Sequence, residues 1–451
     1  MWLSFNTLMF YFYRYNKWKH AVGRENVPKD GPVILCANHT NAVMDPVLIG
    51  STFWRRSWFL ARSDVFKNKR IAKFLTFIGI IPIYRLQEGV ENLSKNDDTF
   101  DKCSQMLAEE KMIMIFSEGL CVQERRLRKL KKGTARIALG TEEKHDFKLG
   151  LKIVPVGLNY SSTPWKFRSR ISIRYGEPFE VKAYEELYRR DKARAINQFT
   201  KDLEEKMRAQ LITIEKKEND EVVGELEEIL FAERCAEKGL DATNPADTHE
   251  VTLEIAAKVN LLEKTSEHQS KEFRQQVKHY FLELKKRKLR DRVLNADDHR
   301  RVTAAKIPFY LLFFISGLPI WLFGVITNYV PYKLPWIIKN KIVKEVEWSA
   351  TVTGMIGVYL WQIWWLLMSL VVALVFRNWY LLGAFMLLVP ICGVHAQAYW
   401  TYLKRFFGSM RWWMTSAADK KMLRGLRAGI IAEYVKLKLP VKKMEDWQLE
   451  E

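Results

Sequence analysis

The sequence predicts an α/β domain followed by a charged helical region and C-terminal membrane helices. Residues 31–180 alternate short apolar, β-branched runs such as PVILCA and KMIMIF with stretches of helical periodicity, which is typical of a sheet flanked by helices. Residues 184–300 are dense in Glu, Lys and Arg and have almost no strand pattern. Three later stretches, residues 307–332, 348–376 and 378–403, contain no charged residue. Each is long enough to cross a bilayer core, for which about 20 apolar residues suffice.

The order of these patterns divides the chain into five parts. The N-terminal residues combine aromatic side chains with a few cations and lack the basic start and cleavage site of a signal peptide. An amphipathic helix lying in the membrane interface is favoured there over an ordinary packing helix. The predicted parts are this helix over 1–23, the α/β domain over 24–185, a charged helical insertion over 186–305, membrane segments over 306–403 and a basic C-terminal tail over 404–451.

The three membrane segments are interrupted in different ways. Only Arg377 separates the second from the third, which predicts a tight helical hairpin. The first contains Gly317-Leu318-Pro319 at its centre, where we expect the helix to break, so that it either spans the membrane or dips in and returns. Lys and Arg flank both ends of this first stretch and follow the third. Because such flanks stay cytoplasmic, we expect an integral membrane protein with a re-entrant first segment and its α/β domain facing the cytoplasm.

Charge and aromatic content indicate the kind of partner. The formal net charge is +20, which attracts nucleic acid or an anionic membrane surface. The 16 Trp residues favour the membrane, because Trp concentrates at the lipid–water interface. The sequence contains no zinc-finger spacing, basic heptad or RNA-binding aromatic signature, so no nucleic-acid partner is expected. The five cysteines have no metal-ligand spacing and predict free thiols rather than a metal site or a disulfide framework.

A histidine and an aspartate follow the first apolar run, in the stretch CANHTNAVMDPVLIG. His39 can serve as a general base near neutral pH if it lies in a turn at a strand end. Six positions along one straight helix would leave His39 and Asp45 about 120° apart around its axis. We therefore place His39 in a loop and the start of a helix near Asp45-Pro46, since Pro suits the first turn. By itself, such a pair is weak evidence of function.

Two further stretches end in residues suited to binding a phosphorylated ligand. The apolar run IMIF leads to Ser117, Glu118 and Gly119, which would lie at the carboxyl end of a strand, where α/β proteins bind ligands. The basic run 125–132 then precedes a possible helix start at Gly133, an arrangement that suits phosphate. The alternative is a solvated basic loop facing anionic lipid.

Two more apolar strands carry residues of interest near their ends. Arg85 follows GIIPIY and could hold a phosphate with its planar guanidinium. Pro155 lies inside the strand IVPVGL, which predicts an edge strand or a bulge because Pro cannot donate to a sheet.

Together, the four stretches resemble, in order, the conserved blocks of the glycerolipid acyltransferase superfamily. The matching segments are NHTNAVMD, GIIPIYR, FSEG and IVPVGL, and the resemblance covers roughly residues 20–185. Five residues rather than four separate His39 from Asp45, which resembles the fungal-type branch that acts on glycerol 3-phosphate and dihydroxyacetone phosphate. Ser117 stands where the family usually has Pro, which we expect to loosen the turn that positions Glu118.

The resemblance implies an acyltransferase fold and a role for each site residue. His39 would deprotonate the acceptor hydroxyl and Asp45 would orient the imidazole, as in the His–Asp half of a catalytic triad. Arg85 and Lys132 would bind the acceptor phosphate. Glu118 and Gly119 would position the glycerol backbone, and Asn38 would hold the loop. The hydroxyl would attack an acyl thioester directly, so the resemblance implies no metal and no cofactor beyond acyl-CoA or acyl carrier protein as the donor substrate.

The expected function is therefore a membrane-bound O-acyltransferase of phospholipid biosynthesis that uses glycerol 3-phosphate. Lysophosphatidate and dihydroxyacetone phosphate are alternative acceptors. A membrane scaffold with an inactive acyltransferase-like domain is the alternative of another class, although a scaffold would not need His39, Asp45, Arg85 or Glu118. The expected partners are membrane lipids, a glycerol phosphate acceptor and an acyl thioester donor.

Overall fold

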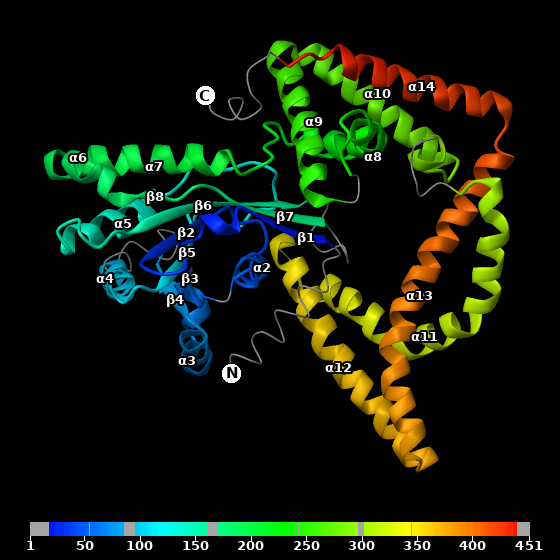
Figure 1. The fold of residues 1–451 in the computed structure, drawn as a ribbon, viewed down its shortest axis with the longest axis horizontal. Helices are drawn as coiled ribbons and strands as arrows, with labels where there is room; N and C mark the ends of the chain where they lie inside the picture. The colour runs from blue at the N-terminus through cyan, green and yellow to red at the C-terminus, as the bar shows by residue number, and fades with distance from the viewer. Residues whose placement is uncertain are drawn as a thin grey trace. The chain divides into compact units, whose positions relative to one another are not determined.

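A computed structural model describes most of the chain, which divides into two compact units. The described residues are 18–53, 55–84, 95–160, 170–241, 244–295, 302–343 and 345–439 (Figure 1). The first unit runs to Glu215 and the second covers Lys216–Leu439. All five cysteines lie within these residues and are free thiols.

The first unit is built on a mixed sheet. The strands of the described residues are β1 (Trp18–Val22), β2 (Val33–Ala37), β3 (Ser57–Arg62), β4 (Ile80–Ile83), β5 (Met112–Phe116), β6 (Lys152–Tyr160), β7 (Arg170–Tyr175) and β8 (Phe179–Glu180). Their order is β1-β7-β6-β2-β5-β3-β4, and β8 pairs with one end of β6. Strands β2, β3, β4, β5 and β6 are mutually parallel, whereas β7 is antiparallel to β6. The predicted α/β fold is confirmed, and the structure shows that the centre of its sheet is parallel.

Pro155 lies in an interior strand, so the predicted edge strand at this position is wrong. It pairs with Cys36 of β2 on one side. On its other side, β6 pairs with β8 as far as Ile153 and with β7 from Val156 onward. Pro155 occupies the gap between these two ladders, where its missing N–H costs no sheet hydrogen bond. Its carbonyl still accepts a hydrogen bond from the Gly176 N–H at 2.9 Å.

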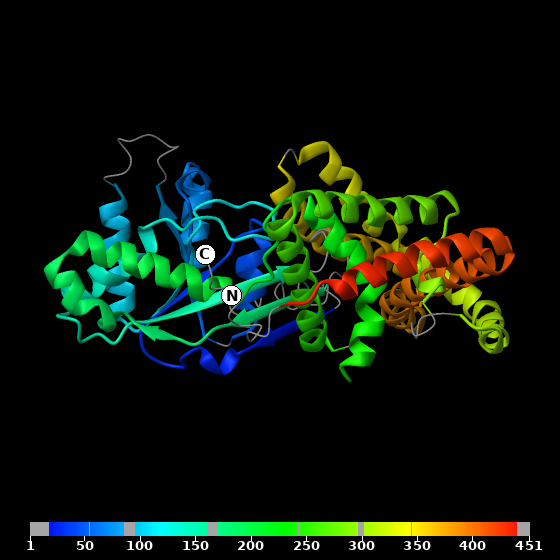
Figure 2. The ribbon, with the colours of Figure 1, turned by 90° about the horizontal axis from the view of Figure 1, so that it is seen from above.

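Helices cover the sheet and extend the first unit beyond the expected boundary at residue 185. They are α2 (Met44–Gly50), α3 (Lys69–Phe77), α4 (Lys95–Ala108), α5 (Gly133–Lys144), α6 (Glu185–Arg190) and α7 (Lys192–Arg208). Helix α7 runs alongside β6 (Figures 1 and 2). Its Ala195, Phe199, Leu203 and Met207 recur every four residues and are buried in the same core as the sheet residue Ile153. The sequence therefore placed the end of the α/β domain too early.

The structure describes only the last residues of the predicted N-terminal helix. Residues 1–17 lie outside the described residues. Trp18–Val22 forms strand β1, which pairs in parallel with β7. The sequence predicts an amphipathic helix over residues 1–23, and this is wrong for residues 18–22, which form the edge strand of the sheet.

The second unit combines a helical bundle with apolar helices. The bundle helices are α8 (Asn219–Glu237), α9 (Pro245–Thr265), α10 (Glu267–Lys286) and α14 (Ala417–Lys436). A buried ionic network fastens α14 to the others. Arg427 donates from Nε to Asp291 at 3.0 Å, from Nη1 to Glu233 at 2.7 Å and from Nη2 to the carbonyl of Ile229 at 2.8 Å. Residues 417–436, part of the predicted basic tail, are thus an ordered helix of this bundle.

Three helices of the described residues are long and apolar enough to cross a membrane. They are α11 (Ile307–Ile342), α12 (Ser349–Phe376) and α13 (Trp379–Met414). Arg377 ends α12 with a left-handed backbone, at φ +49°, and the Asn378 side chain caps the start of α13 by accepting from the N–H groups of Tyr380 and Leu381. This is the helical hairpin that the sequence predicts, although α13 continues past the expected end at residue 403.

Helix α11 does not break where the sequence predicts. The backbone stays helical through Gly317, Leu318 and Pro319. There α11 packs closely on α13: the Gly317 carbonyl lies 3.3 Å from His395 Nε2, and a side chain at Gly324 would collide with the backbone of α13.

The axis of α11 instead bends further along (Figure 1). As far as Asn328, whose amide donates to the Val389 carbonyl, α11 follows α13, and Pro335 lies beside Gly357 of α12. Pro331 and Pro335 lie in this second half of α11, and Pro inside a helix is a common cause of such kinks.

Candidate active site

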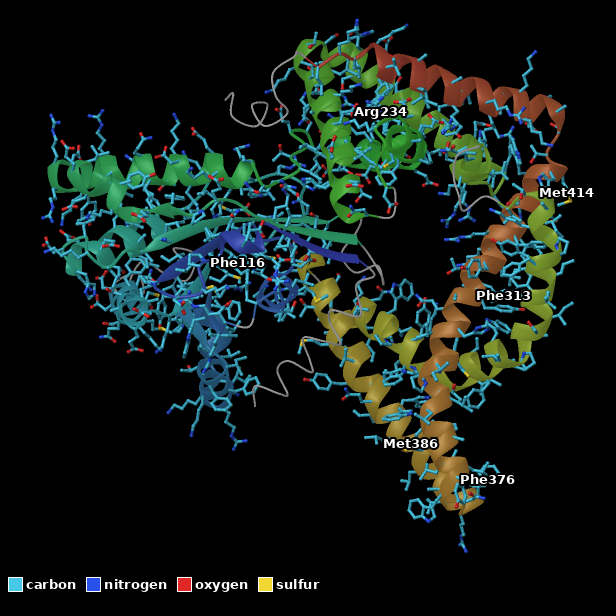
Figure 3. All side chains as sticks on the ribbon, viewed as in Figure 1. Phe116, Arg234, Phe313, Phe376, Met386 and Met414 are labelled. Carbon is cyan, nitrogen blue, oxygen red and sulfur yellow. The ribbon has the colours of Figure 1, made fainter. Side chains whose placement is uncertain are left out.

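The candidate site lies where three neighbouring parallel strands end. Strand β2 pairs with β5 on one side and with β6 on the other, with Ala37 level with Phe116 and Val156. The residues that follow β2 and β5, and the last residues of β6, therefore meet at one edge of the sheet. Figure 3 labels Phe116, which ends β5 at this edge.

His39 and Asp45 meet there, as the sequence predicts. His39 lies in the loop after β2, and Asp45 lies in the first turn of α2, which begins at Met44. A hydrogen bond of 2.9 Å joins Nδ1 of His39 to Oδ2 of Asp45. The Asp45 side chain is fully buried, and that of His39 is 16% exposed. With Nδ1 held by the carboxylate, Nε2 is the ring nitrogen that can take a proton from a substrate.

The Asp45 carboxylate also organises the loop around it. Its Oδ2 accepts the backbone N–H groups of Thr40 and Asn41, each at 2.7 Å. Its Oδ1 accepts the Tyr160 hydroxyl at 2.5 Å. A buried carboxylate needs such donors, because an unpaired buried charge is strongly unfavourable. The loop and Tyr160 therefore hold Asp45 in one position relative to His39.

Tyr160 is a site residue that the sequence analysis did not identify. It is the last residue of β6, next to the strand that leads to His39. Burial, together with the negative charge of Asp45, raises the pKa of Tyr160 well above its ordinary value. Tyr160 therefore stays protonated and acts as a donor. A polar residue closing an apolar strand was the available signal, but its partner depends on strand order, which the sequence pattern does not give.

Phe116 packs against one face of the His39 imidazole. Its ring stacks on that of His39 with 4.0 Å between centroids and 18° between the ring planes. Stacking limits rotation of the imidazole, while the hydrogen bond to Asp45 sets its direction. The ring of His39 is thus held by two contacts from different elements.

Glu118 joins two loops through its carboxylate. Oε1 accepts the backbone N–H of His39 and Oε2 accepts that of Arg128, each at 3.0 Å. Burial raises the pKa of Glu118, and these N–H groups partly oppose the rise. Both carboxylate oxygens are engaged by the protein, so in this structure Glu118 positions the His39 loop. Gly119 beside it has φ +69°, a left-handed conformation that favours glycine.

Asn38 has a similar positioning role. Its amide donates to the Leu158 carbonyl at 3.1 Å, and its side-chain oxygen accepts the Leu158 N–H at 2.7 Å. This pair of bonds extends the contact between β2 and β6 by one side chain. Asn38 is buried and thus holds the loop, as the resemblance implies for it.

Ser117 does not loosen the turn before Glu118, in contrast to the expectation from the sequence. The residue is buried, and its hydroxyl lies 2.9 Å from that of Thr134 in α5. Its carbonyl accepts the Lys131 N–H at 2.8 Å. Where Pro would only restrict the backbone, Ser117 ties this turn to the start of α5.

Of the two predicted phosphate-binding residues, the structure describes Lys132 but not Arg85. Arg85 lies outside the described residues, directly after Tyr84, whose backbone N–H and carbonyl are both bonded to the Asn96 side chain at 2.9 and 2.8 Å. Lys132 is exposed and precedes the first residue of α5. Within the preceding basic run, Arg126 and Arg128 form ion pairs with Glu124. No group of three or more His, Cys, Asp or Glu in the described part of the chain is placed to hold a metal ion.

Part of the first unit is similar to known acyltransferases. Residues 20–159 match the family model described as Acyltransferase. A 75-residue stretch is 44% identical to glycerol-3-phosphate O-acyltransferase 1 of Saccharomyces cerevisiae, covering 17% of this chain and 10% of the yeast protein. The chain therefore spans about a tenth of the length of that curated relative.

Among solved structures, the chain is similar to the 1-acyl-sn-glycerophosphate acyltransferase PlsC of Thermotoga maritima. The identity is 17%, with 45% of this chain and 79% of that chain covered and a TM-score of 0.30.

Proposed function

We propose that this chain, whose first unit carries an acyltransferase domain of the glycerolipid acyltransferase superfamily, transfers a fatty acyl group from a thioester to the hydroxyl of glycerol 3-phosphate. The observation that carries the proposal is the 2.9 Å contact between His39 Nδ1 and the buried Asp45 carboxylate. The yeast relative is named as a glycerol-3-phosphate O-acyltransferase, and its similarity to a 75-residue stretch of this chain supports this choice of acceptor.

His39 acts as the general base in the proposed reaction. Nε2 takes the proton of the acceptor hydroxyl as its oxygen attacks the thioester carbonyl carbon. The carbon–sulfur bond of the tetrahedral intermediate then breaks, and the imidazolium returns the proton to the departing thiolate. Asp45 stabilises the imidazolium and keeps Nδ1 protonated, so that Nε2 faces the acceptor. The product is an ester and a free thiol, and no acyl group is attached to the protein.

Binding of the acceptor is assigned by resemblance. Arg85 would hold the phosphate, with Lys132 adding positive charge at the start of α5. Glu118 and Gly119 would position the glycerol backbone. For Glu118 this is an indirect role, because its two oxygens accept the N–H groups of His39 and Arg128. The donor is an acyl thioester of coenzyme A or of acyl carrier protein.

Acyl transfer to competing acceptors tests the proposal. Membranes that carry the protein are supplied with a labelled acyl thioester and, in parallel, with glycerol 3-phosphate, lysophosphatidate or dihydroxyacetone phosphate. The highest kcat/KM is expected with glycerol 3-phosphate. A higher value with another acceptor would reassign the substrate, and no transfer to any of the three would favour the membrane scaffold.

We also propose that the ends of α11 lie on one side of the membrane, the cytoplasmic side. Arg287, before α11, donates from Nε to Asp419, after α13, at 3.0 Å. Arg427 and Asp291 make a second contact between the same two regions. Three complete crossings would put these regions on opposite sides, so the contacts support an α11 that dips in and returns while α12 and α13 form a hairpin. The basic flanks of these helices favour the cytoplasm.

Cysteine labelling tests this topology. In a chain with Cys121→Ser, Lys339→Cys is expected to react with an impermeant reagent from the cytoplasmic side only. Arg377→Cys, at the tip of the hairpin, is the matched control and should react from the outer side only. Labelling of position 339 from the outer side would contradict the re-entrant arrangement.

A further inference from the structure

Helix α3 has an apolar face that the rest of its unit leaves uncovered. None of its residues, Lys69–Phe77, is buried. Ile71, Phe74 and Phe77 are 49%, 59% and 57% exposed. Their spacing of three residues places them on one side of the helix, while Ala72 and Leu75 face the unit and are half-buried. Figure 3 shows the side chains of this helix projecting away from the sheet.

The charge of this segment indicates what covers the face. Between residues 67 and 77 the chain has four cations, Lys67, Lys69, Arg70 and Lys73, and no carboxylate. All four are exposed. A short helix that combines exposed Phe and Ile with neighbouring Lys and Arg is suited to the interface of an anionic bilayer, where the apolar side chains enter the acyl region and the cations meet lipid phosphates.

The start of α3 is also at the edge of the sheet that carries the site. Asn68 caps the helix by accepting the N–H groups of Arg70 and Ile71. The chain reaches this cap directly from the carboxyl end of β3 through the short 3-10 helix Ser63–Phe66. Because β3 is parallel to β5, its carboxyl end lies at the same edge as Glu118. The helix then runs back toward the amino end of β3, where the Phe77 carbonyl accepts a hydrogen bond from Arg56 at 3.0 Å. A bilayer bound along α3 would therefore lie beside the sheet, with the start of the helix at the edge that carries His39.

We infer that α3 is a membrane-docking helix that holds the acyltransferase unit against an anionic phospholipid surface, independently of the three apolar helices of the second unit. Such a contact is interfacial, not spanning, since the helix has nine residues. The inference concerns this surface and does not require glycerol 3-phosphate to be the acceptor.

Quenching by brominated lipids in the full-length protein tests this inference. The protein, with Cys121→Ser and Phe74→Cys, is labelled with an environment-sensitive fluorophore and placed in nanodiscs of phosphatidylcholine and phosphatidylglycerol with brominated acyl chains. Lys201→Cys on the exposed side of α7 is the matched control. The label at position 74 is expected to be quenched several-fold more than the label at 201. Equal, weak quenching at both positions would overturn the inference.

Two further arms separate the lipid from other occupants. Lys69→Glu with Lys73→Glu, or omission of phosphatidylglycerol, is expected to reduce quenching at position 74. Quenching that ignores both changes would contradict the role of the anionic surface. A blue-shifted label at position 74 that brominated lipid does not quench would mean that protein covers α3, either residues 1–17 or another chain, and would also overturn the inference.

Discussion

The Tyr160 hydroxyl donates a 2.5 Å hydrogen bond to Asp45 across the end of the sheet. It brings a residue of β6 to the carboxylate that holds His39, although the two residues are far apart in the sequence. Asp45 is thus fixed by donors from two separate elements, its own loop and the neighbouring strand. This arrangement makes Tyr160 a positioning residue for the proposed base.

Removing this hydroxyl should weaken the positioning of Asp45 without removing the base. A hydrogen bond to a charged group contributes about 1.5–3 kcal/mol, so Tyr160→Phe is expected to lower kcat by about 10- to 100-fold. The KM for both substrates should stay close to that of the wild type, because Tyr160 contacts Asp45 and not the substrate. Steady-state kinetics would measure both, and a raised acceptor KM with unchanged kcat would place Tyr160 in the binding site instead.

Asp45→Asn should affect the reaction more strongly. Asparagine has one acceptor oxygen where Asp45 has two, and its amide N–H groups oppose the existing donors and no longer favour a proton on Nδ1 of His39. We expect kcat to fall by about 10²–10⁴-fold, comparable with loss of general base catalysis. Asp98→Asn on the exposed side of α4 is the control. Near-normal kcat for Asp45→Asn would show that the pair does not act as base and orienter.

Asn38 predicts an effect on stability. Asn38→Ala leaves the buried N–H and carbonyl of Leu158 without their partners. At about 1–3 kcal/mol for each unsatisfied group, the free energy of unfolding should fall by about 2–6 kcal/mol. Thermal unfolding would measure this loss. The control variant is Gln105→Ala, at an exposed position of α4. Equal melting temperatures for the two variants would contradict the structural role of Asn38.

Glu118 predicts a pH dependence of stability. Burial raises its pKa in the folded protein above the ordinary value of 4.5. Between these two values the folded state holds a proton that the unfolded state has lost, so the contribution of Glu118 to stability falls as the pH rises.

The variant Glu118→Gln isolates this effect because it removes the titrating group. The difference in stability, wild type minus variant, is therefore expected to decrease as the pH is raised from 4.5. Thermal unfolding of both proteins over a pH series would measure it. A difference that grows with pH would mean that the folded state favours the ionised carboxylate.

The sequence predicts those parts of the structure that depend on local pattern. Arg377 is the only charge in a long apolar region, and it marks the turn of the hairpin. Likewise, Pro46 indicates the first turn of a helix, which correctly places Asp45 near His39. The meeting of the two residues needs only a loop and a helix start.

The errors arise where packing decides. Phe199 and Leu203 have the same spacing whether α7 packs on a sheet or on other helices, so the sequence could not assign this helix to the first unit. Pro319 remains inside a helix because that part of α11 packs against α13, and the bend occurs later. Tyr160 reaches Asp45 only because β6 lies next to β2, which is a property of strand order.

Acyl transfer by His39→Ala tests the central claim most directly. The variant is assayed with the same thioester donor and acceptors as the wild type, beside His145→Ala, an exposed histidine at the end of α5. Both proteins should insert into membranes and unfold at nearly the wild-type temperature. The account predicts that His39→Ala loses about 10²–10⁴-fold in kcat while His145→Ala stays active, because only His39 deprotonates the acceptor. A folded His39→Ala protein with activity within about twofold of the wild type would contradict the proposed mechanism.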